Sequence, residues 1–225
     1  MPTQVTVRGS YSAFLPPERA TVHATVGLEG PTLAPVYDGV VRALAAVSDS
    51  VAELHRPEAG PITWWSTTRI ATWSRRPWNK DGKQLPLVHH ASVGVKVKFS
   101  DFEALADWLR GHVGQTSGFH VERIEWALTE LRKQGLTREV RARAVEDARS
   151  RAQEYADALD LGAVTPTEIA DAGMLSGRVS PESSATAAYA RKGGPGGGGD
   201  ADLALVPEDI EISAYVDARF VVGER

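Results

Sequence analysis

The sequence predicts an α+β fold, in which antiparallel strands form a sheet and amphipathic helices cover one of its faces. Segments with an apolar residue at every second position alternate with segments whose apolar residues recur every three or four positions. Turn residues join neighbouring strand segments as hairpins, which favours antiparallel pairing. The order strand, helix, strand, strand occurs twice, at about 19–99 and 119–222. We therefore expect two related β-α-β-β halves in a single domain, 1–225.

The chain begins with two predicted strands and a helix. A Pro-Pro pair separates a strand over 3–15 from one over 19–29, and Gly9 predicts a bulge or bend in the first. The second strand alternates cleanly between apolar and polar residues, so one face is expected to lie in the core. A helix with an apolar stripe is expected over 33–54.

A long hairpin, residues 62–99, is expected next. Its arms cover 62–73 and 85–99, and turn-forming residues lie at 79–82. Alternation in the second arm predicts one shared face for the following residues: Leu87, His89, Ala91, Val93, Val95, Val97 and Phe99.

The remaining chain predicts helices and strands around one long loop. Residues 100–103 have the pattern of a capping box and predict a short helix, which is followed by a strand at about 120–129. Another strand is expected up to residue 172, and the last over 209–222. The glycine-rich stretch 176–206 is poor in large apolar residues and is expected to be a flexible loop.

One long amphipathic helix is predicted between residues 137 and 162. Asp147 and Arg151 form a favourable i,i+4 pair, and Gly162 is expected to end the helix in a left-handed conformation. Steps of three and four place these residues on its expected inward stripe: Val145, Ala148, Ala152, Tyr155 and Leu159.

Composition limits the function classes. The 225 residues include 25 Lys and Arg and 29 Asp and Glu, a formal charge of −4, so no global charge attracts nucleic acid or anionic lipid. The chain has no cysteine, which excludes disulfides, thiolate nucleophiles and cysteine-bound metals. Neither a signal-peptide pattern nor an apolar run of membrane-spanning length occurs, so the expected compartment is the cytoplasm, with no membrane span.

The sequence offers no catalytic, cofactor-binding or metal-binding residue. His89 and His90 are adjacent in a strand and point to opposite faces, so they cannot both bind one metal there, and His89 is expected to pack. The glycine tract 193–199 lacks the Gly-Lys-Ser/Thr ending of a phosphate loop. Motifs such as GxSxG or HExxH are also absent. We expect a protein that is not an enzyme and needs no cofactor.

One cluster of residues differs from this pattern of ordinary structural residues. Four of the six tryptophans, Trp64, Trp65, Trp73 and Trp78, fall within fifteen residues of the long hairpin, among several cations. Strand alternation places Trp65 and Trp73 on one face and Trp64 on the other. Tryptophan and arginine are enriched at interface hot spots, and exposed aromatics beside cations also stack on nucleic-acid bases. The expected interaction surface comprises Trp65, Arg69, Trp73, Arg75, Arg76 and Trp78.

Three interpretations of this cluster remain open. The tryptophans could pack under the helices while the cations solubilise the hairpin. They could instead contact another protein chain, or they could bind nucleic acid or another anionic ligand. The acidic net charge weighs against the last.

Four segments resemble the SIMPL-domain family, also called DUF541: VTVRGSYSAFLPPERATVHATV, HHASVGVKVKFSDFEAL, REVRARAVEDARSRAQEYADALDLG and EDIEISAYVDARFVV. Members of this family are often exported, some form ring-like homo-oligomers, and some are linked to envelope or oxidative-stress phenotypes. The resemblance implies a homo-oligomeric, stress-related protein and supplies no catalytic motif. The favoured expectation is a non-enzymatic protein that self-associates. The alternative is a binding module for an anionic partner, such as nucleic acid, through the long hairpin.

Overall fold

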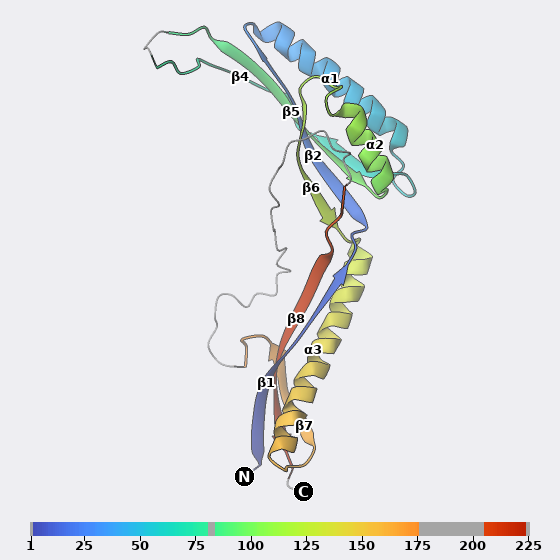
Figure 1. Cartoon of the computed structure of the whole chain (residues 1–225), viewed down its shortest axis with the longest axis vertical. Coiled ribbons are helices and arrows are strands. Elements are labelled where there is room, and N and C mark those ends of the chain that lie inside the picture. The colour runs from blue at the N-terminus through green and yellow to red at the C-terminus, as the bar shows by residue number, and fades with distance from the viewer. Residues whose placement is uncertain (1, 81–83, 176–204, 224–225) are drawn as a thin grey trace. The chain divides into compact units, whose positions relative to one another are not determined.

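The computed structural model describes residues 2–80, 84–175 and 205–223 (Figure 1). Its described part contains helices and antiparallel sheets, which confirms the predicted α+β class. The chain divides into two compact units. The hairpin unit contains the described residues of 17–127 and 197–208. The α3 unit contains those of 1–16, 128–196 and 209–225.

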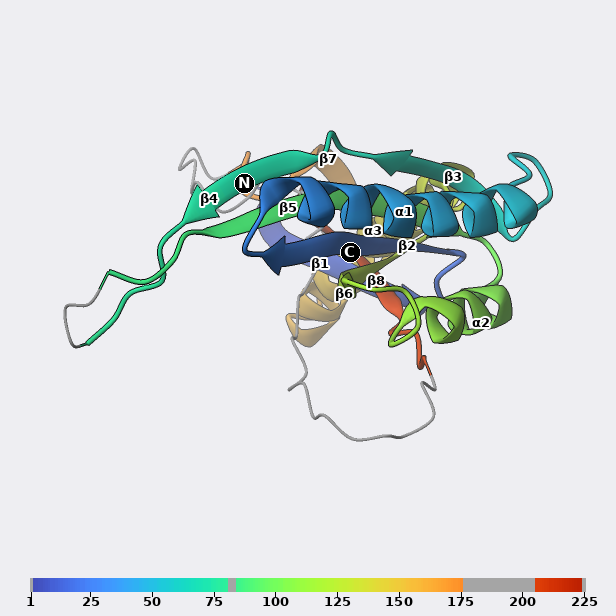
Figure 2. The same cartoon turned by 90° about the horizontal axis from the view of Figure 1, so that it is seen from above.

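The hairpin unit is an antiparallel sheet with two helices on one face (Figure 2). The strand order is β3-β5-β2-β6, and β4 also pairs with β5. The strand bounds are β2 (Arg19–Gly30), β3 (Ile62–Thr67), β4 (Ala71–Arg75), β5 (Val88–Phe99) and β6 (Phe119–Ala127), and the helices are α1 (Leu33–Leu54) and α2 (Phe102–His112). The strand β6, which the sequence placed in a second half beginning near 119, pairs here with β2.

The core of the hairpin unit forms where α1 lies on β2 and β5. The inward face of β5 carries the buried residues that the alternation predicts, from Ala91 to Phe99. The helix α1 buries one stripe at steps of three and four, namely Val36, Val40, Ala43, Val47 and Val51. The expected capping box is wrong by one residue. Asp101 is the N-cap of α2 and accepts the N–H groups of Glu103 and Ala104, whereas Ser100 donates to the Gly60 carbonyl.

The long hairpin forms as predicted, but a bulge interrupts one arm. Thr67 pairs with Val95 and Ala71 pairs with Ser92, so the first arm advances four residues while β5 advances three. A single extra residue reverses the faces of all side chains beyond it. The side chains of β3 and β4 therefore follow different alternation patterns.

In the α3 unit, the strand order is β1-β8-β7 and all pairs are antiparallel. One long helix packs on one face of this sheet, as Figure 1 shows. The strands are β1 (Thr3–Leu15), β7 (Val164–Asp171) and β8 (Ile210–Val222), and the helix is α3 (Glu130–Ala158). The helix thus begins seven residues before the predicted start, after Thr129, whose side chain accepts the Arg132 N–H.

The inward stripe of α3 differs from the predicted one. Ala148 and Ala152 are buried as expected, whereas Val145, Tyr155 and Leu159 are exposed. The buried positions recur at every fourth residue: Leu136, Val140, Ala144, Ala148, Ala152 and Ala156. A residue four positions on is rotated by about 40° on an α-helix, so this stripe winds around α3. From Leu136 to Ala156 the buried position moves by about 200° around the helix axis. A prediction that keeps all inward residues on one face of the helix therefore fails along part of α3.

Two glycine predictions also change. Gly9 lies in an unbroken pairing of β1 with β8, so the expected bulge is wrong. A Cβ at Gly9 would lie 2.6 Å from Ala148 N and 2.8 Å from Ala148 Cβ, so this glycine permits the close approach of α3. The left-handed residue after α3 is Asp160, with a φ of 55°, and not Gly162, whose N–H donates to the Gly223 carbonyl.

Most of the expected glycine-rich loop, residues 176–204, lies outside the described residues. Within the described ranges, no helix is both long and apolar enough to cross a lipid bilayer.

Candidate functional site

The β4 strand carries part of the predicted interaction surface. All five of its residues are exposed. Trp73 lies opposite His90 and stacks on it, with ring centroids 5.2 Å apart and planes 4° apart. His90 is buried, and its Nδ1 lies 3.3 Å from a carboxylate oxygen of Glu29. One ring face of Trp73 is thus fixed against the sheet, while 46% of the residue remains exposed.

The bulge separates the other tryptophans into two environments. Trp65 lies opposite Val97 and packs against the core of the hairpin unit, so the expectation that it shares a face with Trp73 is wrong. Ile70 also packs against this core. Trp64 lies opposite Lys98, whose ammonium is 5.6 Å from the indole centroid. This is a cation–π distance on the sheet face away from the helices.

The remaining predicted site residues lie along the first arm of the long hairpin. Arg69 lies in the bulge, and Arg75 ends β4; both are exposed. The Arg76 guanidinium donates to the Leu85 carbonyl at 2.9 Å, which holds the two arms together beyond β4. Trp78 is 80% exposed. The structure therefore brings Trp73, the arginines and Trp78 to one exposed segment and leaves Trp65 packed against the core.

Charge is segregated within the hairpin unit, which the whole-chain value conceals. Residues 62–99 contain seven Lys and Arg and one Asp, a formal charge of +6. Residues 17–61 together with 100–127 contain five Lys and Arg and eleven Asp and Glu, a formal charge of −6. Positive charge is thus concentrated in the long hairpin and negative charge in the rest of the hairpin unit.

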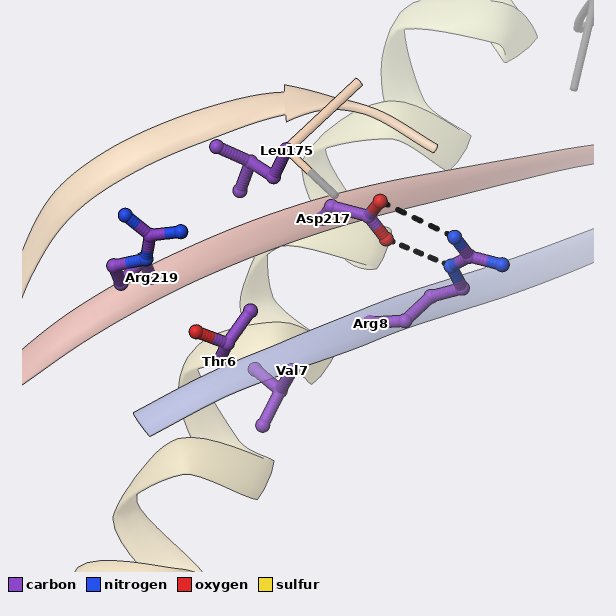
Figure 3. Close-up of a pocket in the computed structure, with 6 residues that line it drawn as sticks. All are labelled: Thr6, Val7, Arg8, Leu175, Asp217 and Arg219. Atoms are coloured by element: carbon purple, nitrogen blue, oxygen red, sulfur yellow. Dashed lines mark hydrogen bonds and ion pairs between the residues drawn. The ribbon is translucent and has the colours of Figure 1, made fainter. Parts of the chain in front are cut away.

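A second candidate is a depression of about 440 Å³ in the α3 unit (Figure 3). It lies on the sheet face away from α3 and is lined by Thr6, Val7, Arg8, Leu175, Asp217 and Arg219. Arg8 holds Asp217 through two bonds: Nε to Oδ1 at 2.7 Å and Nη2 to Oδ2 at 3.2 Å. The second cation, Arg219, pairs with Glu168 at 3.0 Å.

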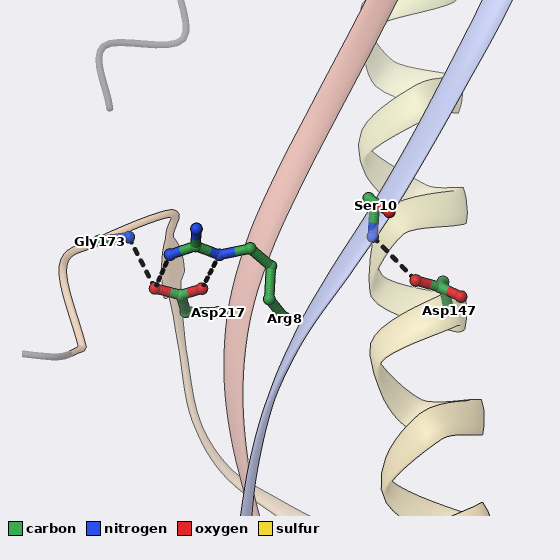
Figure 4. Close-up of polar contacts among 5 residues, drawn as sticks. All are labelled: Arg8, Ser10, Asp147, Gly173 and Asp217. Atoms are coloured by element: carbon green, nitrogen blue, oxygen red, sulfur yellow. Dashed lines mark hydrogen bonds and ion pairs between the residues drawn. The ribbon is translucent and has the colours of Figure 1, made fainter. Parts of the chain in front are cut away.

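The charged side chains of this depression are all paired. Asp217 also accepts the Gly173 N–H at 2.6 Å (Figure 4). The Arg8 hydrogen bond holds the pKa of the Asp217 carboxyl below its ordinary value, the Gly173 N–H adds to this, and burial opposes it. An ionised, fully engaged carboxylate is a poor proton donor. This arrangement ties the turn after β7 to the pair β1 and β8.

The same close-up shows a contact at the edge of that sheet. Asp147 of α3 accepts the backbone N–H of Ser10 in β1 at 2.9 Å (Figure 4). Asp147 also pairs with Arg151 at 3.1 Å, as the sequence predicts. Within the described residues β1 is an edge strand, so this carboxylate occupies a backbone donor on the side of β1 away from β8.

A buried polar cluster joins α1 to α2. Ser50 donates its hydroxyl proton to the Val47 carbonyl at 2.8 Å, and its oxygen accepts from Trp108 Nε1 at 3.0 Å. The Ser50 oxygen also lies 2.7 Å from His112 Nε2. His112 Nδ1 lies 2.8 Å from the Thr116 hydroxyl. Burial lowers the pKa of the His112 imidazole, which favours the neutral ring. The serine and histidine are close enough for acid–base chemistry, but the serine proton points to a helix carbonyl.

Among the described residues, no group of three or more His, Asp or Glu side chains is arranged to hold a metal ion. The sequence did not predict the Arg8–Asp217 pair, because the two residues are separated by more than 200 positions. The sequence gives one indication of this pair. Both residues are charged, and each lies in a predicted strand between apolar neighbours that face inward.

The fold and these sites define a small antiparallel α+β protein with an exposed aromatic and cationic hairpin. Comparison with protein families matches residues 5–220 to SIMPL, described as a protein of unknown function (DUF541). The chain belongs to the SIMPL family. No curated protein matches it significantly.

Proposed function

We propose that this SIMPL protein is non-enzymatic and acts through self-association of the long hairpin. The observation that supports this proposal is the exposure of β4, of Trp73 within it (46%) and of Trp78 beyond its end (80%). A two-stranded projection cannot bury such side chains against itself. Tryptophan and arginine contribute most to binding when a partner excludes water from them.

The test compares the removal of two exposed indoles from the β4 segment with the removal of one exposed indole from β3. Trp73→Ala combined with Trp78→Ala should lower the solution mass, measured by light scattering, while the circular dichroism spectrum stays native. Trp64→Ala is the control, because Trp64 has a similar exposure of 45% but lies on β3. A monomeric mass for the unmodified protein at every concentration would contradict self-association.

Nucleic acid as the partner is a second candidate, favoured by the formal charge of +6 on residues 62–99. Exposed indoles beside cations are suited to stacking on single-stranded bases. Binding of a fluorescent single-stranded oligonucleotide would then weaken steeply as salt rises. Pairing of two cationic hairpins would respond oppositely, because salt screens their mutual repulsion. Salt dependence therefore separates the two candidates.

A further inference from the structure

The edge of β4 is open in the part of the chain that the structure describes. The sheet path ends at β3, and β4 pairs only with β5 along that same side. An unpaired edge presents a row of backbone N–H and C=O groups that can accept another strand. Figure 1 shows β4 leading away from the helix-covered part of the hairpin unit.

The β4 sequence can pair antiparallel with a second copy of itself. With a two-fold axis at Trp73, this residue lies opposite itself and Thr72 lies opposite Ser74. Arg75 then lies opposite Ala71, and Arg76 opposite Ile70. No cation directly faces another, so this register avoids the like-charge pairs that destabilise cross-strand contacts.

A second exposed surface lies on α1. Leu33, Tyr37 and Val41 recur at steps of four and are 42%, 42% and 40% exposed, respectively. They lie beside the buried stripe, on the flank opposite Ser50, which bonds to α2. Figure 2 shows α1 running above the sheet with α2 on one side and β4 on the other. The apolar flank of α1 therefore faces the side on which the β4 edge is open.

The apolar flank of α1 and the open edge of β4 also lie at the same position along the strand direction. A Cβ on Gly30 would touch Val36, and Gly30 pairs with His89, which pairs with Ser74. Likewise, a Cβ on Gly39 would touch Leu28, whose partner Ala91 pairs with Thr72. The first turns of α1 thus lie beside β4, and one partner can cover both surfaces.

The alternation of side chains along the β4 segment determines which residue of a second copy would lie near the α1 flank. Thr72 pairs with the buried Ala91, so even-numbered positions of the β4 segment face the helix side. The strand β4 ends at Arg75, and the Arg76–Leu85 bond holds the arms together beyond it. If pairing with a second copy extends the strand past Arg75, positions 76 and 78 would continue this alternation. Across the two-fold axis, Trp78 of the second copy would then lie opposite Thr68, on the helix side of the sheet.

We propose that two copies join β4 to β4 in antiparallel register about Trp73, and that Trp78 of each copy packs on the α1 flank formed by Leu33, Tyr37 and Val41 of the other. This inference rests on the proposed self-association and specifies its interface. The occupant of both surfaces is a second copy, because the register places no two cations opposite each other and covers the strand edge and the helix flank together.

Cysteine cross-linking tests the register, since the chain has no cysteine of its own. Opposite residues in an antiparallel pair have Cα atoms about 4.5–5.5 Å apart, which a disulfide can span. Thr72→Cys combined with Ser74→Cys should give a covalent dimer under mild oxidation. Thr72→Cys alone is the control. In this register residue 72 does not lie opposite residue 72 of the second copy, so little cross-linking is expected. Equal cross-linking of both would overturn the register.

Polar substitution tests the α1 flank. Tyr37→Ser with Val41→Ser should raise the dimer dissociation constant at least tenfold. Arg42→Ser with Ala46→Ser, exposed positions on the flank nearer α2, should leave it unchanged. An unchanged constant for the first pair would overturn the contact with Trp78. If the unmodified protein associates but neither the cross-link nor the weaker binding is seen, this interface alone is overturned. If the unmodified protein is monomeric, the proposed function is overturned as well.

Discussion

Replacing Gly9 by alanine should destabilise the α3 unit, because β1 passes too close to α3 for a Cβ. The added carbon would lie 2.8 Å from Ala148 Cβ and 2.6 Å from Ala148 N. Carbon atoms in good contact are about 3.5–4.0 Å apart, so α3 and β1 must separate by roughly 1 Å. The nearest groups are helix backbone and an alanine, and neither can rotate away.

The magnitude follows from the cost of overpacking a close-packed core, about 1–3 kcal/mol. For a chain of this length, each kcal/mol changes the thermal midpoint by about 2–4 °C, so Gly9→Ala should lower it by roughly 2–12 °C. Differential scanning calorimetry measures this directly. The control is Gly135→Ala in the same unit, where an added Cβ meets no atom within 4 Å.

The control has the opposite expected sign. Gly135 lies inside α3, and alanine is favoured over glycine in a helix by about 1 kcal/mol, so Gly135→Ala should raise the midpoint. A Gly9→Ala variant that melts at or above the temperature of the unmodified protein would refute the close-approach argument.

Three further predictions concern buried groups. Ala148→Asp should prevent native folding of the α3 unit, since its carboxylate would be buried without a partner, whereas Arg149→Asp on the exposed face should keep a native circular dichroism spectrum. Burial lowers the pKa of His112, so stability should be full above about pH 6.5 and fall as the pH drops below it. The thermal midpoint of His112→Gln should therefore decline less between pH 7.5 and 5.5. The pKa of Asp217 is also lowered, by Arg8, so its contribution should be present above about pH 4 and be lost in more acidic solution. Asp217→Asn should melt lower at pH 7 and lose less stability between pH 5 and 3.

Alternation and turn chemistry predicted most of the fold, since these signals are local. The strands over 3–15 and 209–222 and the helix over 33–54 agree with β1, β8 and α1 to within a residue. The α3 stripe was predicted only at Ala148 and Ala152, because small residues form it and because a repeat of four drifts around the helix. Val145, Tyr155 and Leu159 are larger and more apolar, so they dominate a pattern based on hydrophobicity, yet Ala144 and Ala156 are what let the strands approach.

The interaction surface was harder to predict, because its geometry depends on one residue of strand register. Alternation from Trp65 to Trp73 assumes an unbroken strand, but the extra residue between Thr67 and Ala71 reverses the later side chains. From the sequence, packing of the tryptophans under the helices and their contact with a partner were alternatives. Because of the bulge, each interpretation applies to different tryptophans. Packing under the helices holds for Trp65, which contacts the core. Contact with a partner stays a prediction for Trp73 and Trp78, which the same bulge leaves on an exposed edge.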